Sequence, residues 1–421
     1  MNESEIVLRY KEALSYCLEH SGFYRKTLNP FVSEIDGFTC IGDFNRLPLT
    51  SKQDLNQYNR DFWSVDEGNI LDYCTTSGTE GKPLIVPLTH SDILRLGLNE
   101  KGSFELAGLT EEDTILLSTT IDKQFMAGLA YKEGANNLGA GLIRLGPGVS
   151  SMQWNAILDL KPTAIVVVPS FLLRLIEYAE ENGIDYKASS LKKAICIGEP
   201  IRTIDFQLSG AAEQILAKWP LQLYSTYASS EIQTAFTECQ FQRGGHYNPE
   251  LIYPEILLED GSQASPGEYG ELVVTSFGVR GLPLIRFKTG DITFLETDPC
   301  PCGHHSYRLG PIIGRKNQMI KVRGTSCYPA TIFNILNKSG IKDFQIKVRS
   351  DEFGLDQVTI YYSNEPRLKK EDLEKRLRAA LRFRPELSEM NASDLQNMVY
   401  PSESRKAVRF KDERNNNISG T

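Results

Sequence analysis

The chain has 421 residues, of which 41% are hydrophobic and 24% are charged, and it carries a formal net charge of −8. This is the composition of a globular protein large enough for two or more domains, and its acidic balance argues against general nucleic-acid binding. No apolar run reaches the length of a membrane span, and the polar N-terminus lacks a signal-peptide pattern. We therefore expect a cytoplasmic protein without a membrane or nucleic-acid partner.

Helices and strands are predicted to alternate in the first half of the chain. Residues 1–70 are predicted to be helical, with an interruption at "TLNPFVSEIDGF". Short apolar runs predict strands at "DTILLSTT", "GLIRLG", "PTAIVVVP" and "KAICIG". Between them, "PSFLLRLIEYAEENG" predicts a helix with Ser170 as N-cap and Gly183 as its stop. The alternation indicates a largely parallel sheet covered by helices.

The sequence becomes strand-rich and turn-rich from about Gly261. After Arg323 an α+β pattern follows, with helices at "YPATIFNILNKSG" and "KKEDLEKRLRAALRF" and strands at "FQIKVRS" and "DQVTIYYS". We therefore predict an α/β fold with a large multi-sheet N-terminal domain over residues 1–316, whose strand-rich subdomain begins at about residue 250. A small α+β domain is predicted over residues 317–421.

A loop of small hydroxyls and glycines occupies residues 73–84, which read "YCTTSGTEGKPL". Backbone N–H groups, hydroxyls and one lysine are groups that hold phosphate, although the same composition suits an ordinary surface turn. Gly78 and Gly81 are too close together for the P-loop of nucleoside triphosphatases, and Pro83 follows Lys82. Apolar runs on both sides predict strands, so a phosphate here would be bound without a helix dipole.

Two short motifs carry further groups suited to a nucleotide. "TYASSE" brings together Tyr227, Ser230 and Glu231. An aromatic face can stack on a base, a hydroxyl can reach a phosphate, and a carboxylate can hold Mg²⁺. "TGD" offers Asp291 to two vicinal ribose hydroxyls, although an aspartate at a loop end is more often a turn residue.

Together and in this order, these motifs resemble the adenylate-forming superfamily of acyl-CoA synthetases, and most closely the phenylacetate–CoA ligase family. The likeness extends over nearly the whole chain, through "SGFYRK", "LPLTSKQDL", "TTSGTEGKP", "GEPI", "TYASSE", "LPLIRFKTGD", "IIGRKNQMIKVRG" and "ESRKAVRF". The resemblance implies an AMP-forming ligase that activates a carboxylic acid as an acyl-adenylate and transfers it to coenzyme A. The implied acid is aromatic, like phenylacetate or benzoate, and the implied cofactors are ATP and magnesium.

The resemblance also assigns roles to single residues. Lys406, on a mobile C-terminal lid, matches the lysine of the adenylation step, while Lys82 and the magnesium carboxylate Glu231 are the other implied catalytic groups. Asn317 matches the hinge residue, and Gly324 lies in the segment that faces the thioester site after rotation of the lid. The implied nucleotide-binding residues are Thr75, Thr76, Ser77, Gly78, Thr79 and Gly81 at the pyrophosphate end, Gly198, Glu199 and Pro200 at the adenine, Thr226, Tyr227 and Ser230 at the base and α-phosphate, and Asp291 and Arg315 at the ribose.

Four positions depart from the family pattern. Glu80 stands where a small hydroxyl is usual, and Ala228 replaces a glycine. Asn317 replaces the hinge aspartate, and Arg405 replaces the glycine before the lysine, which makes Lys411 a second candidate for that role. None of these departures removes a core chemical group.

The acid is expected near "TTIDKQFMAGLAYKEG", which follows a predicted strand. Phe125, Met126, Ala127 and Gly128 would line an apolar slot there, and an ordinary role in core packing suits the same residues.

Four residues in two loops are candidates for a structural zinc site. "ECQFQRGGH" holds Cys239 and His246, and "DPCPCGHH" holds Cys300 and Cys302. Together they make a Cys₃His set, and part of the resembling ligase family carries a similar arrangement. His304 or His305 would be the alternative to His246, and free buried cysteines are the alternative to a metal site.

Other functions remain open at this point. The acyl acceptor would be coenzyme A, a carrier protein or an amine, and a nucleotide-binding homologue with weak catalysis is a further alternative. A hydrolase is disfavoured because no G-x-S-x-G occurs and the chain has only 5 histidines. The expected partners are thus a small carboxylic acid and the acyl acceptor, and a homodimer is a candidate assembly.

Overall fold

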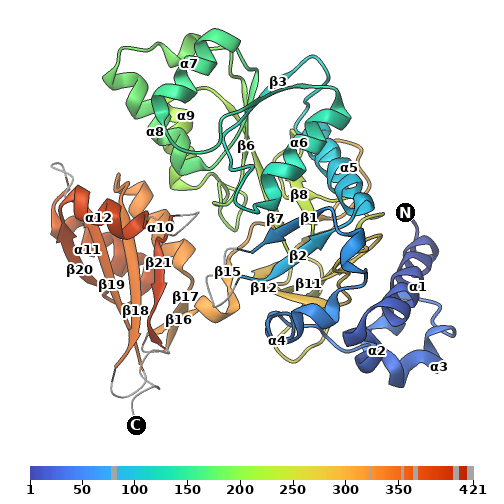
Figure 1. The fold of residues 1–421 in the computed structure, drawn as a ribbon. Helices are drawn as coiled ribbons and strands as arrows, with labels where there is room; N and C mark the ends of the chain where they lie inside the picture. Colours follow the sequence, from blue (N-terminus) through green and yellow to red (C-terminus); the bar gives the residue numbers. More distant parts are fainter. Residues whose placement is uncertain (77–82, 323, 352–354, 364–367, 402–406, 415–421) are drawn as a thin grey trace. The chain divides into compact units, whose positions relative to one another are not determined.

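The chain divides into two compact units, which are described separately. Unit 1 comprises residues 1–207 and 214–312, and unit 2 comprises residues 208–213 and 313–421. Among the helices described, none is long and apolar enough to span a bilayer. The structure is a computed structural model (Figure 1), and it describes residues 1–76, 83–322, 324–351, 355–363, 368–401 and 407–414.

A nine-stranded sheet runs through unit 1, in the order β13-β14-β9-β8-β7-β6-β5-β3-β4. The strands from β4 to β7 are parallel, and the pairs from β7 to β13 are antiparallel. β5 is buried along its whole length, as expected for an apolar strand covered on both faces. The strands are β3 (Thr114–Leu117), β4 (Gly141–Arg144), β5 (Ala164–Val167), β6 (Lys193–Cys196), β7 (Gln222–Ser229), β8 (Thr234–Glu238), β9 (Gly245–His246), β13 (Leu295–Glu296) and β14 (Arg308–Leu309).

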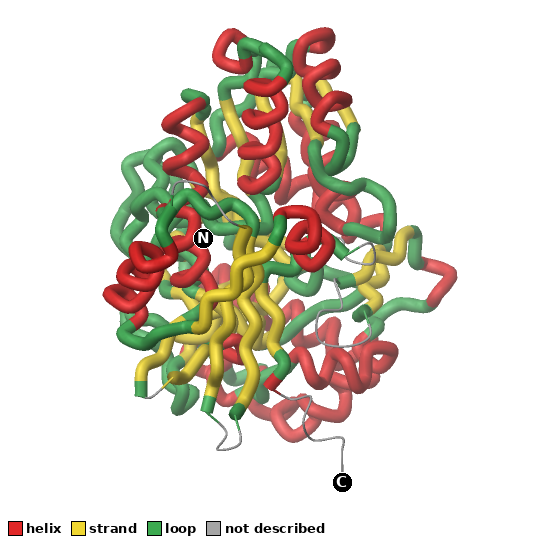
Figure 2. The backbone as a smooth tube through the Cα atoms, turned by 90° about the vertical axis from the view of Figure 1, so that its left-hand side faces the viewer, coloured by secondary structure: helices red, strands yellow, loops and turns green. Residues whose placement is uncertain are grey.

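Helices flank the parallel strands, which appear in yellow between red helices in Figure 2. A capping box between Thr89 and Asp92 begins α5. The prediction that Ser170 caps α8 is wrong: Val168 is the N-cap, and Pro169 takes the first helical position, which proline favours. The helices of this region are α5 (His90–Leu106), α6 (Met126–Leu138), α7 (Ser150–Leu160), α8 (Pro169–Glu181) and α9 (Gly210–Lys218), with the 3₁₀ turn η4 (Tyr186–Ala188).

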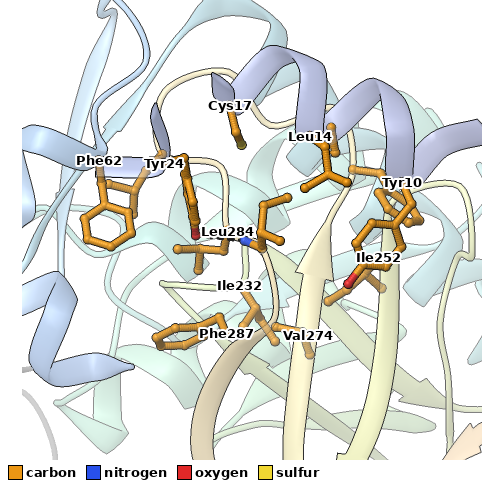
Figure 3. Close-up of a cluster of buried hydrophobic side chains, with 14 of the residues drawn as sticks. Tyr10, Leu14, Cys17, Tyr24, Phe62, Ile232, Ile252, Val274, Leu284 and Phe287 are labelled. Carbon is orange, nitrogen blue, oxygen red and sulfur yellow. Dashed lines mark hydrogen bonds between the residues drawn. The ribbon is translucent and has the colours of Figure 1, made fainter. Parts of the chain in front are cut away.

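The N-terminal helices share a hydrophobic core with the strand-rich part of unit 1 (Figure 3). Tyr24 lies at the centre of this contact: its hydroxyl pairs with Thr50 Oγ1 at 3.1 Å and accepts from the backbone N–H of Ile285 at 2.8 Å. The predicted helical character of residues 1–70 is confirmed, in short pieces. They are α1 (Glu3–His20), α2 (Gly22–Leu28), η1 (Asn29–Phe31), α3 (Val32–Ile35), η2 (Ile41–Arg46), α4 (Lys52–Phe62) and η3 (Glu67–Asn69).

Antiparallel strands β10 (Ile252–Leu257), β11 (Gly270–Ser276) and β12 (Phe287–Thr293) form a second sheet of unit 1. The pairing of β11 with β12 changes register between the Glu271–Ile292 and Val273–Lys288 pairs, so three residues of β12 face one residue of β11. Gly290 lies in this bulge with φ of +79°, a conformation that glycine adopts without strain. A smaller hairpin pairs β1 (Asp72–Thr75) with β2 (Ile85–Leu88).

Unit 2 has an α+β fold around a mixed four-stranded sheet in the order β20-β19-β18-β21. Buried Leu373, Leu377 and Leu381 lie on one face of the charged helix α11 and belong to the core of this unit. The predicted strands "FQIKVRS" and "DQVTIYYS" are β18 and β19. The elements are β15 (Gly314–Arg315), η5 (Lys316–Gln318), β16 (Ile320–Val322), β17 (Thr325–Cys327), α10 (Pro329–Lys338), β18 (Phe344–Ser350), β19 (Asp356–Ser363), α11 (Lys370–Leu381), β20 (Glu386–Met390), α12 (Ala392–Val399) and β21 (Phe410–Asp412).

Candidate functional site

The antiparallel pair of β7 and β8 carries the "TYASSE" residues. Thr226 lies opposite Thr237 in the register, and their buried hydroxyls pair at 3.1 Å. Ser230 and Glu231 follow in the turn between the two strands, where Ser230 is partly exposed and Glu231 is buried. The end of β7 and the turn after it therefore carry, in this order, the aromatic ring of Tyr227, the hydroxyl of Ser230 and the carboxylate of Glu231.

Asp291 joins this hairpin from β12. The hydroxyl of Tyr227 donates to Asp291 Oδ2 at 2.6 Å. Thr289 holds the backbone of the bulge, because its hydroxyl donates to Leu272 O at 2.9 Å and accepts from the N–H of Asp291 at 3.1 Å. The bulge thus aims the carboxylate at Tyr227. Two residues that are 64 positions apart in sequence, and that carry the expected groups for a base and a ribose, lie in direct contact.

Glu231 has a cation close to its carboxylate. Its side chain is 11% exposed, and Lys52 Nζ lies 4.0 Å from Oε1. Lys52 is the first residue of α4, and a capping box between Ser51 and Asp54 fixes the start of that helix. The sequence predicts no role for Lys52, although "LPLTSKQDL" belongs to the resemblance, because no local signal joins this lysine to a residue far along the chain.

The hydroxyl-rich loop begins at the end of β1. Hydrogen bonds close its neck: Thr76 N donates to Leu84 O at 3.0 Å, and Leu84 N donates to Thr76 Oγ1 at 3.1 Å. Thr75 N donates to Gln124 O at 2.9 Å, which ties the neck to the segment before α6. The loop lies between two paired strands, as predicted. The remaining loop residues of the prediction, Ser77, Gly78, Thr79, Glu80, Gly81 and Lys82, lie outside the described residues.

The "GEP" segment follows β6 at the same edge of the sheet as Tyr227. Cys196 pairs with Ser225 in the parallel register, so Gly198 and Tyr227 each lie two residues beyond the last pair. Gly198 has φ of +74°, and it is exposed together with Pro200. The carboxylate of Glu199 accepts from the N–H and the hydroxyl of Ser170 at 2.9 and 2.8 Å, so it caps α8. Carboxyl ends of parallel strands are where α/β sheets bind ligands.

The predicted acid slot lies at the start of α6. Phe125 precedes the helix and is partly buried, as is Ala127, which packs against a hydrophobic core. Gly128 is buried, and a Cβ added to it would lie 2.1 Å from Thr120 O and 2.5 Å from the Cα of Ile121. The helix therefore approaches the backbone after β3 so closely that only glycine fits at this position.

The remaining predicted nucleotide residues belong to unit 2. Arg315 ends β15, and Asn317 lies in η5, where its carbonyl accepts from Arg414 at 2.9 Å. Lys411, the second candidate for the adenylation lysine, lies on β21 and pairs with Glu413 at 3.0 Å. Lys406 and Arg405 lie outside the described residues.

The four predicted zinc ligands come together in unit 1. The ligand atoms of Cys239, His246, Cys300 and Cys302 all lie within 4.8 Å of one another. Cys239 Sγ is 3.6 Å from Cys300 Sγ, and Cys302 Sγ is 3.4 Å from His246 Nε2. A tetrahedral zinc ion with ordinary bond lengths places its ligand atoms about 3.5 to 3.8 Å apart, so these spacings fit a closed site.

The surroundings of this cluster orient the ring of His246 and favour its neutral form, which is the form that binds a metal. Its Nδ1 lies 3.1 Å from Ser306 Oγ, which leaves Nε2 facing Cys302. Burial lowers the pKa of His246 to about 4, with smaller contributions from His304 and Arg308, so the ring is neutral at physiological pH. Burial also raises the pKa of Cys239 to about 12, so its thiolate needs a compensating cation. No sequence motif indicates the contact of Ser306 with His246, because it depends on the pairing of β9 with β14.

The sequence and the fold of this chain are similar to those of known proteins. The AMP-binding enzyme family matches residues 37–280. The phenylacetate-coenzyme A ligase of Pseudomonas putida is 30% identical over 77% of this chain and 73% of its own, and that of Thermus thermophilus is 29% identical over 82% and 77%. A solved 2-hydroxyisobutyryl-CoA ligase in complex with its acyl-adenylate has a TM-score of 0.85 at 22% identity, covering 98% of this chain and 90% of that chain.

Proposed function

This chain belongs to the AMP-binding enzyme family, and we propose that it is an AMP-forming ligase that joins an aromatic carboxylic acid to coenzyme A through an acyl-adenylate. The observation that carries the proposal is the contact between Tyr227 and Asp291, together with the buried carboxylate Glu231 in the turn after the strand of Tyr227. These are the groups required for a base, a ribose and a metal ion. Similarity to phenylacetate-coenzyme A ligases supports the acid–CoA ligase activity and favours an aromatic acid.

Each residue of the site has a separate task in this proposal. The ring of Tyr227 stacks on the adenine, and the carboxylate of Asp291 accepts from the ribose hydroxyls, with Arg315 as its partner in the family pattern. Ser230 reaches the α-phosphate. Glu231 holds magnesium, which neutralises phosphate charge when bound. Thr75 and Thr76 at the neck of the phosphate loop, and Lys82 within the loop, are assigned to the pyrophosphate end.

The chemistry consists of an adenylyl transfer followed by an acyl transfer. A carboxylate oxygen of the acid attacks the α-phosphorus of ATP, the bond to the bridging oxygen breaks, and pyrophosphate leaves. The sulfur of coenzyme A then attacks the acyl carbon, and AMP leaves with the oxygen that joined it to the acid. Because carboxylate and triphosphate are both anionic, we assign Lys406 to the first transfer, and a mobile lid over residues 317–421 would withdraw it before the second.

The Cys–His cluster is proposed as a structural zinc site. Two ligand pairs at 3.6 and 3.4 Å, which are spacings expected around zinc, and the neutral ring of His246 support the metal. Cys239 directly follows β8, the strand after Glu231, and His246 ends β9, whereas Cys300 and Cys302 follow β13, close in sequence to Asp291. All four coordination positions are filled by protein, so the metal would hold these two segments together and would not take part in catalysis.

The proposal is tested by ATP–pyrophosphate exchange with phenylacetate, benzoate, acetate and isobutyrate, followed by mass spectrometry of the products formed with coenzyme A. We expect exchange with an aromatic acid and formation of its thioester. Exchange restricted to aliphatic acids would refute the substrate class. Exchange without a thioester would transfer the acceptor role to a carrier protein or an amine, and absence of exchange with every acid would indicate a homologue with weak catalysis.

A further inference from the structure

Lys52 is a cation of the candidate site, and the proposed function assigns it no role. It lies at the first position of α4, and its side chain is 29% exposed. Its ammonium group is 4.0 Å from the carboxylate of Glu231, whose side chain is only 11% exposed. A carboxylate this poorly hydrated is costly to keep ionised unless a cation is close, so Lys52 supplies charge that the nucleotide-free site needs.

The backbone before Lys52 is attached to the strand that carries Asp291. Thr50 N donates to Arg286 O at 3.0 Å, and Lys288 N donates to Thr50 O at 2.8 Å. The hydroxyl of Thr50 also donates to Ile285 O at 2.8 Å. These bonds extend the sheet by one bridge, between Thr50 and Phe287, at the strand that leads directly into the bulge. Strand β12 therefore positions both residues: it contains Asp291, and it anchors the backbone two residues before Lys52.

A change of partner follows when magnesium and ATP bind. Glu231 would hold the magnesium ion, which would supply positive charge to this carboxylate, and the ammonium group of Lys52 would then be available to the phosphates of ATP. We propose, building on the function above, that Lys52 neutralises Glu231 in the nucleotide-free enzyme and donates to a β- or γ-phosphate oxygen of magnesium-bound ATP. Because AMP lacks the β- and γ-phosphates, Lys52 serves the pyrophosphate end of ATP and contributes little to binding of AMP.

The test compares Lys52→Met with the wild type by titration calorimetry, using MgATP and AMP in the absence of acid. Loss of one charge-assisted hydrogen bond should raise the Kd of MgATP by about tenfold or more and leave the Kd of AMP unchanged. Lys52→Arg should restore most of the MgATP affinity. Lys101→Met is the matched control, because Lys101 pairs with Glu105 on the exposed face of α5. Thermal melting without ligand checks that each variant is folded, and Lys52→Gln replaces Lys52→Met if that variant does not fold.

The outcomes separate this inference from the proposed function. If the wild type binds MgATP and catalyses exchange while Lys52→Met binds MgATP equally well, Lys52 is only a partner of Glu231 and the inference is wrong. An equal loss of affinity for MgATP and AMP would also contradict it, because it would indicate a distorted adenosine site. If the wild type neither binds MgATP nor catalyses exchange, the proposed function fails instead.

Discussion

Glu100 should make the stability of unit 1 depend on pH. It lies on α5 with 4% of its surface exposed, and α6 packs so closely that a Cβ on Gly134 would be 2.4 Å from the Cβ of Glu100. Oε1 accepts from Asn99 at 3.0 Å, whereas Oε2 has no hydrogen-bond partner within the described part of the chain. Burial raises the pKa of Glu100 from 4.5 to about 7, and hydrogen bonds from Asn99 and Ser103 offset only part of this.

The sign follows from proton binding. The folded state holds the proton of Glu100 more tightly than the unfolded state, so the protein loses stability as pH rises from about 4.5 through 7, and the full cost is present above pH 7. Glu100→Gln has no proton to lose. Relative to this variant, the wild type should lose about 2 to 3 kcal/mol of unfolding free energy between pH 5 and pH 8, at about 1.4 kcal/mol for each unit of pKa shift.

Urea unfolding of both proteins at pH 5 and pH 8, followed by tryptophan fluorescence, measures this difference. Glu105→Gln is the control, because Glu105 is exposed on the same helix, and it should follow the wild type at both pH values. Parallel pH profiles of the wild type and Glu100→Gln would refute the reasoning, since they would mean that Glu100 is solvated or paired in the folded protein.

Four further variants test the site. Asp291→Asn should keep the fold and raise the Kd of ATP by about tenfold, measured by calorimetry, and unchanged binding would remove Asp291 from the ribose. Cys300→Ser with Cys302→Ser should lose about one zinc per chain by elemental analysis and lower the melting temperature, whereas a metal-free wild type with full activity would exclude the site. Gly128→Ala should cost about 1 to 3 kcal/mol in urea unfolding because its Cβ meets backbone, and an unchanged midpoint would show that α6 moves freely. Lys406→Ala should slow pyrophosphate exchange by about 100-fold or more and spare thioester formation from pre-formed adenylate, whereas unchanged exchange would transfer the role to Lys411.

Local sequence patterns predicted the elements well where burial is continuous or alternating. Ala164–Val167 is an uninterrupted apolar run and forms the buried strand β5, and the two long strands of unit 2 begin and end where their patterns do. The N-cap of α8 was misplaced because the capping carboxylate comes from Glu199, 29 residues along the chain from Ser170. Ser170 near the helix start predicts an N-cap locally, but in the folded chain the carboxylate of Glu199 accepts the hydrogen bonds at this helix end.

The sequence predicts which residues belong to the candidate site, but it does not predict which of them lie in contact. The sequence named Tyr227 and Asp291 separately, whereas their contact depends on a bulge in β12, for which Gly290 is the only local sign. The cysteine and histidine positions were predicted from spacing and resemblance, and strand pairing brings them together. The proximity of Lys52 to Glu231 depends on the bridge from Thr50 to β12, which no short motif encodes.

The central claim is that the acid becomes joined to AMP before it reaches coenzyme A. Phenylacetate labelled with ¹⁸O in its carboxylate, or the aromatic acid most active in exchange, is incubated with ATP, magnesium, coenzyme A and the protein, and the nucleotide product is analysed by mass spectrometry. We expect AMP that carries one ¹⁸O atom from the acid, together with unlabelled pyrophosphate. Formation of ADP with labelled inorganic phosphate, or of unlabelled AMP alongside the thioester, would contradict it.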